Sequence, residues 1–195
     1  MTHPVRRLLL LAVAVVLTLT ASGCSSFHGL NGTGDKQYVE GDGTIRQIPA
    51  ADRDDPVDFS GKDLDGKQLS LAAMRGKPTV VNVWWAGCPP CRKEAPLLVG
   101  AQKQLGDRAN FVGIDIRDGG TAAGKTFQTQ YGITWPSFYS PGGEAVLAFP
   151  GTLSPNSVPA TVVLDAQGRV AASIIGEVPS QLTLVEVVRG VMDRG

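Results

Sequence analysis

The chain has 195 residues, with 18 Lys or Arg and 18 Asp or Glu, so its formal net charge at pH 7 is zero, and 43% of it is hydrophobic. A chain of this length is expected to form one domain with a sizeable core. The balanced charge excludes the basic surface that a nucleic-acid-binding protein needs, so we expect no nucleic-acid partner.

The N-terminal part of the chain has the pattern of a secretion signal. Arg6 and Arg7 precede an apolar stretch from Leu8 to about Leu19, and small residues then lead to Cys24. This stretch of about 12 residues is shorter than the ~20 that cross a bilayer, which favours a cleaved signal over a permanent transmembrane anchor.

The sequence around Cys24 resembles the lipobox of bacterial lipoproteins, in which the cysteine after the cleavage point is acylated. Ala21 departs from that pattern, because leucine is commonest at its position. We expect residues 1–23 to be removed and Cys24 to be lipidated, which would anchor the protein to the outer face of the cytoplasmic membrane. The alternative is cleavage nearby by an ordinary signal peptidase, which would give a secreted protein.

Residues 24–52 are expected to be a lipidated N-terminus and linker, because the part after Cys24 is rich in small and polar residues and lacks an apolar period. Within it, residues 38–48 contain two short runs with strand character around a Gly-Asp-Gly turn, which also fits a small hairpin packed on the domain. The folded domain is expected to be residues 53–195.

The order of apolar runs and turn residues predicts an α/β domain. In chain order the predicted elements are strands at 57–59, 68–71 and 79–85, a helix at 89–105, a strand at 111–116, a helix within 118–131, strands at 160–164 and 169–175, and a helix from about Pro179. The run 79–85 is β-branched and almost fully apolar, which is typical of a strand covered on both faces. Because a strand–helix–strand unit makes its strands parallel, we expect a compact three-layer α/β plan with a mixed sheet.

Local signals support the helices at the end of this plan. Phe127 and Tyr131 are four residues apart and so share one helix face. Pro179 is a favoured first-turn residue. The final helix is predicted to bury one apolar stripe, formed by Leu182, Val185, Val188 and Met192.

Cys88, Pro89, Pro90 and Cys91 lie between the predicted strand 79–85 and the helix that follows. Two thiols in this position favour dithiol–disulfide exchange, although the same spacing also serves as half of a zinc site. The other cysteine is Cys24 and the two histidines are His3 and His28, so a second half-site is missing. We therefore expect no metal and no cofactor.

The two cysteines are predicted to have different roles. Cys88 precedes the helix N-terminal amides, whose partial positive charge favours a thiolate, so it should be the attacking nucleophile. Cys91, inside the first turn, should be more buried and should resolve the mixed disulfide. Arg92 and Lys93 either add positive potential or form a solvated helix face. An inert structural disulfide between Cys88 and Cys91 is the alternative interpretation of the motif.

Residues 82–96, Asn-Val-Trp-Trp-Ala-Gly-Cys-Pro-Pro-Cys-Arg-Lys-Glu-Ala-Pro, resemble the TlpA/ResA-like (DsbE-related) membrane-anchored thioredoxins. Residues 158–161, Val-Pro-Ala-Thr, are similar to the cis-proline segment of that family. The resemblance implies a thioredoxin-like fold with an N-terminal hairpin and a central insertion at about 119–131. It also implies a protein thiol–disulfide oxidoreductase outside the cytoplasm, which often reduces apocytochrome c or other exported proteins and receives electrons from a membrane partner.

The substrate surface is expected to surround the two cysteines. A cis bond between Val158 and Pro159 would bring a proline without an N–H against the sulfurs and leave the Val158 backbone free to pair with a substrate peptide. Pro89 and Pro90 are expected to face the substrate. The family usually has tryptophan immediately before the first cysteine, where this chain has Gly87. We expect Trp85 to replace part of that missing ring.

Asn82 stands where cytosolic thioredoxins carry an acid that helps to move a proton on the resolving thiol. Asparagine does not titrate, so the sequence shifts this role to Glu94, one turn after Cys91, which is predicted to accept its proton directly or through water. The alternative role for Glu94 is a carboxylate that stabilises the first helical turn.

Other functions require residues that the chain lacks at the corresponding positions. A copper metallochaperone needs a histidine near the cysteines, and no histidine follows His28. A peroxidatic enzyme needs a threonine three residues before its cysteine, and that residue is Trp85. A non-catalytic lipoprotein module with a structural disulfide requires an unreactive Cys88. Within redox chemistry, a disulfide-forming oxidase is the rival to the expected reductase, and the residues do not separate the two.

Overall fold

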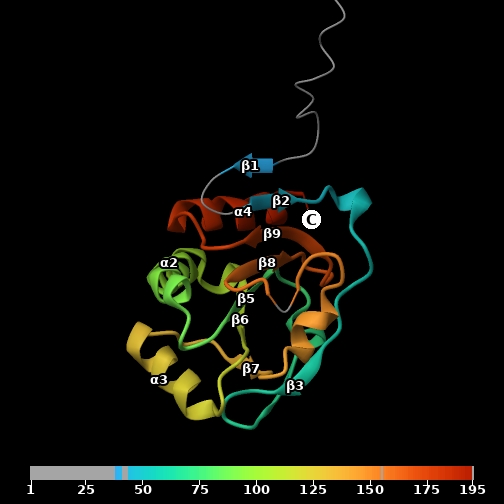
Figure 1. Cartoon of the computed structure of the whole chain (residues 1–195). Helices are drawn as coiled ribbons and strands as arrows, with labels where there is room; N and C mark the ends of the chain where they lie inside the picture. The colour runs from blue at the N-terminus through green and yellow to red at the C-terminus, as the bar shows by residue number, and fades with distance from the viewer. Residues whose placement is uncertain (1–37, 41–43, 155, 195) are drawn as a thin grey trace, which may run out of the picture. The chain divides into compact units, whose positions relative to one another are not determined.

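The computed structural model describes residues 38–40, 44–154 and 156–194. The predicted signal at 1–23, Cys24 and the first part of the linker lie outside these residues. The described strands form a seven-stranded mixed sheet with the order β1-β2-β9-β8-β5-β6-β7 and a separate two-stranded sheet of β3 and β4 (Figure 1).

The centre of the sheet is the predicted strand–helix–strand unit. It consists of β5 (Thr79–Trp84), α2 (Pro89–Leu105) and β6 (Asn110–Asp115). β5 and β6 are parallel, and all six residues of β5 are buried. The helix begins and ends where the sequence predicts, since prolines occupy its first positions and Gly106 caps its C-terminus.

The segment after β6 adds a second strand–helix–strand unit. It contains α3 (Thr121–Tyr131) and β7 (Ser137–Tyr139), which pairs in parallel with β6. Phe127 of α3 stacks on Trp84 with ring centroids 4.5 Å apart, and it also contacts Tyr131. The region expected as a central insertion, at about 119–131, thus forms α3, which packs beside the end of β5 and leads to the edge strand β7.

The remaining strands extend the sheet on the other side of β5. β8 (Ala160–Leu164) and β9 (Val170–Ile175) form the predicted antiparallel hairpin. β2 (Thr44–Gln47) pairs with β9, and β1 (Tyr38–Glu40) pairs with β2. The hairpin that the sequence offered as an alternative to a linker is thus present at the sheet edge. Ile45 is 1% exposed, and burial of this side chain explains why the sheet extends into a segment of polar composition.

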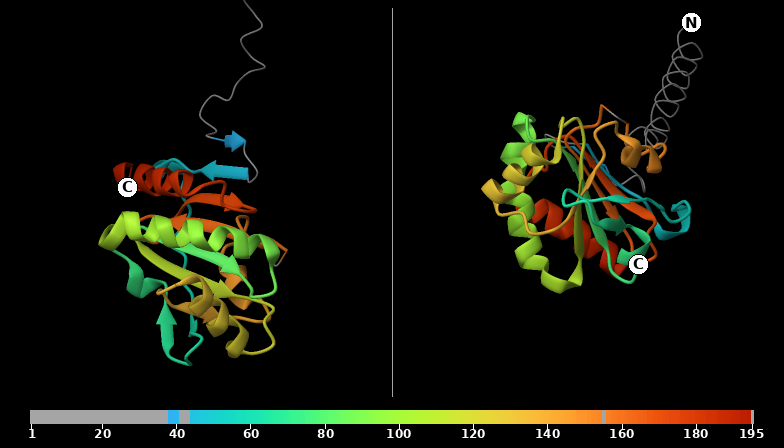
Figure 2. Two further views of the ribbon diagram at one scale, coloured as in Figure 1. Left: turned by 90° about the vertical axis from the view of Figure 1, so that its left-hand side faces the viewer. Right: turned by 90° about the horizontal axis from the view of Figure 1, so that it is seen from below.

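Side chains alternate between two cores on the two faces of the sheet. Val80 belongs to the core that α2 and α4 (Gln181–Asp193) cover, and Val81 to the core on the opposite face. The opposite core is closed by the segment around β3 and β4 and by a 3₁₀ helix, η4 (Glu144–Ala148), as Figure 2 shows. This three-layer arrangement confirms the α/β, thioredoxin-like fold class.

Two local expectations are wrong. The first hairpin strand is β3 (Ser60–Lys62), not 57–59, and it pairs with β4 (Gln68–Ser70). The turn fixes this register, because the Asp63 carboxylate accepts hydrogen bonds from the amides of residues 65 and 67. The buried stripe of α4 also differs, because Leu182 is 63% exposed while Leu184 is fully buried. Ser180 caps the helix, which begins at Gln181, so Pro179 precedes the helix instead of lying in its first turn.

Candidate redox site

The redox site is built at the point where β5 ends and α2 begins. Cys88 is the N-cap residue of α2, and its Sγ accepts a hydrogen bond from the amide of Cys91 at 3.2 Å. The two cysteines form a disulfide with their Cα atoms 5.3 Å apart. A sulfur in this place receives the partial positive charge of the helix N-terminus, which favours the thiolate when the bond is reduced.

Both cysteines are covered in this oxidised form. Cys88 is 3% exposed and Cys91 is 1% exposed. Cys91 is slightly more buried than Cys88, in the expected direction. Cys88 is nevertheless less accessible than an attacking thiol needs to be. Trp85 and Val158 pack against the cluster that contains the two cysteines. A partner sulfur can therefore reach the disulfide only if part of this cover moves.

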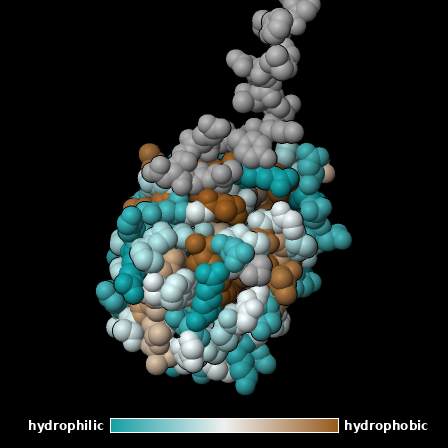
Figure 3. Space-filling model, viewed as in Figure 1, coloured by the Kyte–Doolittle hydropathy of each residue, from teal (hydrophilic) through white to brown (hydrophobic). Residues whose placement is uncertain are grey.

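The face that carries the site combines apolar and polar surface. The N-terminal end of α2 points toward the side that faces the viewer in Figure 1, as the left view of Figure 2 shows. Apolar side chains gather near the middle of this face, with hydrophilic side chains around them (Figure 3). Pro89 is exposed and Pro90 is partly exposed. These features suit contact with another protein.

The loop before β8 carries the predicted cis-proline. The bond between Val158 and Pro159 is cis. Ala160 pairs with Val83, so the loop lies beside the end of β5. The Val158 amide donates to the carbonyl of Asn156 at 3.0 Å. The expectation of a free Val158 backbone is therefore wrong for its N–H, because the tight turn at 156–158 already uses that donor.

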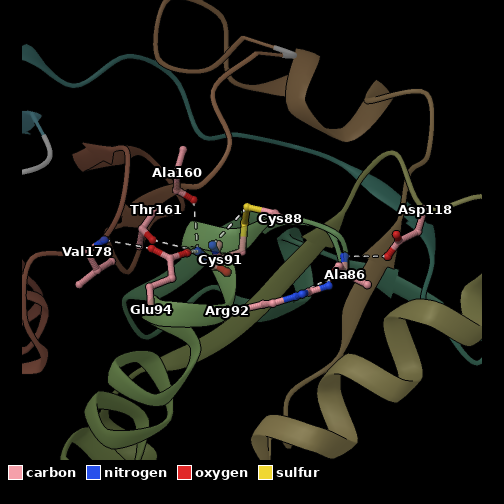
Figure 4. The surroundings of a disulfide bond; sticks show 10 residues. Ala86, Cys88, Cys91, Arg92, Glu94, Asp118, Ala160, Thr161 and Val178 are labelled. Atoms are coloured by element: carbon pink, nitrogen blue, oxygen red, sulfur yellow. Dashed lines mark hydrogen bonds between the residues drawn. A yellow bond between two sulfur atoms is a disulfide. The ribbon is translucent and has the colours of Figure 1, made fainter.

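Glu94 lies in a buried polar network below the disulfide (Figure 4). Its carboxylate accepts hydrogen bonds from Asn82 Nδ2 at 2.8 Å and from the Val178 amide at 3.0 Å. Asn82 also donates to Thr161 Oγ1 at 3.1 Å. Burial raises the pKa of Glu94 to about 7, although the hydrogen bonds from Val178 and Asn82 oppose this shift. Its carboxylate is engaged with Asn82 and Val178, which argues against the alternative role at the helix amides.

Comparison with known proteins identifies the family. Residues 53–173 match the AhpC/TSA family. The chain belongs to the AhpC/TSA family. A ResA thiol-disulfide oxidoreductase from Bacillus thuringiensis (strain Al Hakam) is 31% identical over 123 residues, covering 61% of this chain and 66% of that protein. A ResA from Bacillus cereus is 26% identical over 175 residues, covering 88% of this chain and 89% of the relative. The chain thus spans just under two thirds of the first relative's length.

Solved structures support the same assignment. A DsbF homologue from Corynebacterium diphtheriae superposes with a TM-score of 0.70 at 31% identity, covering 81% of this chain and 95% of that one. A secreted thiol-disulfide isomerase from Corynebacterium glutamicum gives a TM-score of 0.72 at 28% identity, covering 76% and 92%. These comparisons confirm the resemblance to TlpA/ResA-like proteins.

This AhpC/TSA family member builds the surface beside Cys88 with Trp85. A Cβ on Gly87 would overlap the six-membered ring of Trp85, so the ring occupies the space that a side chain at position 87 would need. Glycine at position 87 therefore permits this placement of the ring. That Trp85 replaces part of the missing tryptophan stays a prediction.

The loop from β5 to α2 has polar supports on both sides. Arg92 donates from its guanidinium to the Ala86 carbonyl at 3.0 and 2.8 Å, and Asp118 Oδ2 accepts from the Ala86 amide at 3.0 Å (Figure 4). Arg92 and Lys93 are both exposed, and Arg92 also holds the loop through the Ala86 carbonyl.

Sequence reasoning missed Thr161, Val178 and Asp118 as neighbours of the site. Asp118 had a recognisable signal, since it follows an apolar strand next to the one that leads to the cysteines, and the ends of parallel neighbours lie together. Thr161 and Val178 had none, because their contacts with Asn82 and Glu94 depend on long-range packing.

Proposed function

We propose that this protein is a thiol–disulfide oxidoreductase that exchanges the Cys88–Cys91 disulfide with thiols or disulfides of other proteins. The observation that carries the proposal is the position of Cys88 Sγ at the N-terminus of α2, bonded to Cys91 and accepting the Cys91 amide hydrogen bond. This geometry stabilises a thiolate at Cys88 and places the resolving sulfur beside it. The names of the ResA relatives support the same chemistry.

In the reductive direction the dithiol form reacts in two steps. The Cys88 thiolate attacks a substrate disulfide, which forms a mixed disulfide and releases one substrate thiolate. The Cys91 thiolate then attacks Cys88 Sγ, which releases the second substrate thiolate and forms the Cys88–Cys91 bond. Two electrons pass to the substrate, and the protons lost by the cysteines balance those taken up by the substrate thiolates.

Glu94 is proposed to accept the proton of Cys91 in the second step. Its pKa, raised by burial to about 7, suits a group that must accept and release a proton near neutral pH. Asn82 and the Val178 amide hold the carboxylate in place. Since Glu94 and Cys91 are three residues apart on one helix, they share a face, and transfer takes place directly or through one water.

The substrate is proposed to bind over Trp85, Pro89, Pro90 and Val158, next to the buried cis-proline Pro159. Trp85 and Val158 pack against the cysteine cluster and are partly exposed, so they can contact both the disulfide and a partner. The turn at 156–158 must open for the Val158 amide to pair with a substrate strand, because that amide is bonded to Asn156.

The protein is proposed to act outside the cytoplasm as a lipoprotein anchored through Cys24, with apocytochrome c or another exported protein as substrate and a membrane protein as electron donor. The signal-like N-terminus supports export, as does the likeness to a secreted isomerase of Corynebacterium glutamicum. In the part of the chain that the structure describes, no helix has the length and apolar character to span a bilayer.

Trapping with Cys91→Ser, combined with a redox titration, tests the function. The variant should accumulate mixed disulfides at Cys88, and Cys88→Ser should form none. The reduction potentials of a thioredoxin-like reductant and of a strong oxidant differ by about 150 mV. A potential near the reducing end with trapped apocytochrome supports the reductase, and one near the oxidising end with many secreted clients supports an oxidase. Exchange that is unchanged in Cys88→Ser would leave only a non-catalytic module.

A further inference from the structure

A surface cavity of about 370 Å³ lies between the loop that leads to Cys88 and helix α3. One wall comes from the loop and from the first turns of α2, and the other comes from one face of α3. The lining side chains are Ala86, Arg92, Ala122, Ala123, Thr126, Phe127 and Gln130. Neither cysteine lines this cavity, and it is separate from the surface over Trp85 and Val158 to which the substrate was assigned above.

The cavity lies at the edge of the sheet that carries the redox site. β5 and β6 are parallel, so the loop after β5 and helix α3 after β6 begin at the same edge. Ligands of α/β proteins bind outside the carboxyl ends of such strands. Ala86 is two residues before Cys88, which places their Cα atoms within about 7 Å of each other. A peptide bonded to Cys88 can therefore place a neighbouring side chain in the cavity.

The cavity and the cis-proline loop flank Cys88. In Figure 4, Ala86 lies on one side of Cys88, while Ala160 and Thr161, which follow the cis-proline, lie on the other. An extended peptide that contacts Val158 and presents its sulfur to Cys88 has further residues on either side of that sulfur. Those on the side away from the cis-proline loop are the ones that reach the cavity.

Arg92 gives the cavity a positive charge. Its Nε and Nη2 atoms donate to the Ala86 carbonyl at 3.0 and 2.8 Å, which holds the guanidinium at the cavity wall. Across the part of the chain that the structure describes, Arg92 forms no ion pair, and Nη1 keeps its donors for another partner. The lining contains no acidic residue. Asp118 contacts the Ala86 amide but does not line the cavity.

The α3 side of the cavity is apolar at its base and open above it. Phe127 is 4% exposed, and its ring stacks on buried Trp84, so the base is fixed by the core. Ala122 and Ala123 are exposed and too small to fill the space. The Thr126 hydroxyl donates to the Ala122 carbonyl at 2.9 Å, which leaves its lone pairs free. An apolar base beside an unpaired guanidinium suits a side chain with an apolar stem and a carboxylate end.

We propose that this cavity binds an acidic side chain, aspartate or glutamate, that lies close to the reacting cysteine in the protein substrate. The inference rests on the proposed exchange function and adds a preference for one class of substrate. Arg92 is the residue that determines this preference, because it supplies the only charge in the lining. A carboxylate there gains charge-assisted hydrogen bonds from the guanidinium, whereas a lysine side chain is repelled by it.

The test measures how fast the reduced full-length chain reduces peptides that carry a neutral leaving group. Each peptide has a single cysteine, joined to 2-thiopyridine by a disulfide, and Glu, Gln or Lys at one of the flanking positions. Attack by Cys88 on the peptide sulfur releases 2-thiopyridone, which absorbs light, and Cys91 then releases the peptide thiol. At one flanking position or more, the Glu peptide should react about threefold faster than its Gln counterpart. The Lys peptide should react more slowly than both.

Two variants remove the proposed preference in different ways. Arg92→Gln removes the charge, and Thr126→Glu places a carboxylate in the cavity without changing the side chain that bonds Ala86. The ratio of Glu to Gln rates should fall to about one in both variants. Because this ratio is taken within one variant, a change in the reactivity of Cys88 cancels. The matched controls Lys93→Gln and Thr129→Glu change exposed residues of the same helices outside the lining and should keep the preference.

The outcomes separate this inference from the function on which it rests. Equal rates for Glu and Gln peptides at every position overturn the cavity as a binding site, as does a preference that survives in Arg92→Gln or in Thr126→Glu. Reduction of the Gln peptides shows in either case that the exchange function stands. If the unmodified chain reduces none of the peptides, the exchange function is refuted, and the inference is refuted with it.

Discussion

Asn82 donates a hydrogen bond to Glu94 at 2.8 Å, and this pair joins β5 to α2 directly below the disulfide. The same amide group reaches Thr161 at 3.1 Å, just after the cis-proline. One neutral side chain therefore ties together β5, α2 and the start of β8. Because Asn82 carries no charge, the proton equilibrium of this region belongs to Glu94.

Glu94→Gln should remove a pH-dependent component of stability. The pKa of Glu94 is raised from 4.5 to about 7, chiefly by burial, so between these pH values the unfolded chain ionises while the folded one stays neutral. Stability then falls as pH rises through this window, by up to about 1.4 kcal/mol per pH unit. Urea unfolding of the oxidised chain at several pH values across this range gives the free energy of unfolding at each pH. In Glu94→Gln this free energy should fall less steeply with pH than in the unmodified chain. The exposed control Glu186→Gln should keep the pH dependence of the unmodified chain. The same pH dependence in Glu94→Gln would show that Glu94 is not the group with the raised pKa.

The same substitution should slow the second step of exchange. Glutamine fills the space of Glu94 but cannot accept the Cys91 proton, and loss of general base catalysis typically costs about 10²-fold or more. Stopped-flow decay of a mixed disulfide at Cys88 should show this loss, together with loss of the rate increase around pH 7 seen in the unmodified chain. A decay rate in Glu94→Gln that still rises around pH 7 would assign the proton to another group.

Trp85→Ala should uncover the disulfide. Since Cys88 is 3% exposed and Trp85 packs against its cluster, removal of the ring should let dithiothreitol reduce the bond several-fold faster. Reaction with a protein substrate should become slower, because the ring no longer contributes apolar contact. Leu147→Ala, at a residue 67% exposed on η4, is the control and should change neither rate. Slower reduction by dithiothreitol in Trp85→Ala would show that the ring does not cover the sulfurs.

Phe127→Ala should destabilise the domain strongly. Phe127 is 4% exposed and stacks on Trp84 with ring centroids 4.5 Å apart. Truncation of such a side chain leaves a cavity and costs about 3–5 kcal/mol. Chemical denaturation of the oxidised chain measures the loss. Leu182→Ala, at a side chain 63% exposed on α4, should stay within about 0.5 kcal/mol of the unmodified chain.

Asp165→Ala should destabilise the domain at neutral pH by about 3–5 kcal/mol, because it leaves Arg53 buried without its partner. Arg53 Nη1 lies 2.9 Å from Asp165 Oδ2, and both side chains are almost fully buried. Burial alone would raise the pKa of Asp165, but hydrogen bonds from Arg169 and Arg53 outweigh it and lower the pKa. The contribution is therefore present above about pH 4 and is lost as pH falls below that value. Thermal unfolding at pH 7 and at pH 3 measures this effect. The difference in Tm between Asp165→Ala and the unmodified chain should be larger at pH 7.

The central part of the fold was predictable because its signals are local. The run 79–84, the cysteines that follow, the prolines at the start of α2 and Gly106 at its end indicate strand, site and helix directly. The first hairpin and α4 were shifted by a few residues, because Asp63 and Ser180 set their boundaries through side-chain hydrogen bonds. The edge pairing of β2 with β9 depends on burial of Ile45, which a short polar segment does not reveal.

The candidate site was predictable where chemistry and spacing coincide and not where packing decides. Cys88, Cys91 and Glu94 follow from a motif and one helical turn. The burial of Cys88 and of the Asp115 carboxyl arises from residues distant in the chain, whereas the Val158 amide is engaged locally by Asn156 in a turn that no residue pattern indicated. Such relationships require the assembled structure.

The overlap between the ring of Trp85 and any side chain at position 87 couples these two positions. A bulky residue introduced at 87 alone would collide with the ring, whereas the same residue combined with a small one at 85 would avoid that collision. Among homologues, the two positions should therefore vary together, so that a large residue at one of them accompanies a small residue at the other. Exchange of the pair in one step, as Trp85→Gly with Gly87→Trp, should be better tolerated than either change by itself.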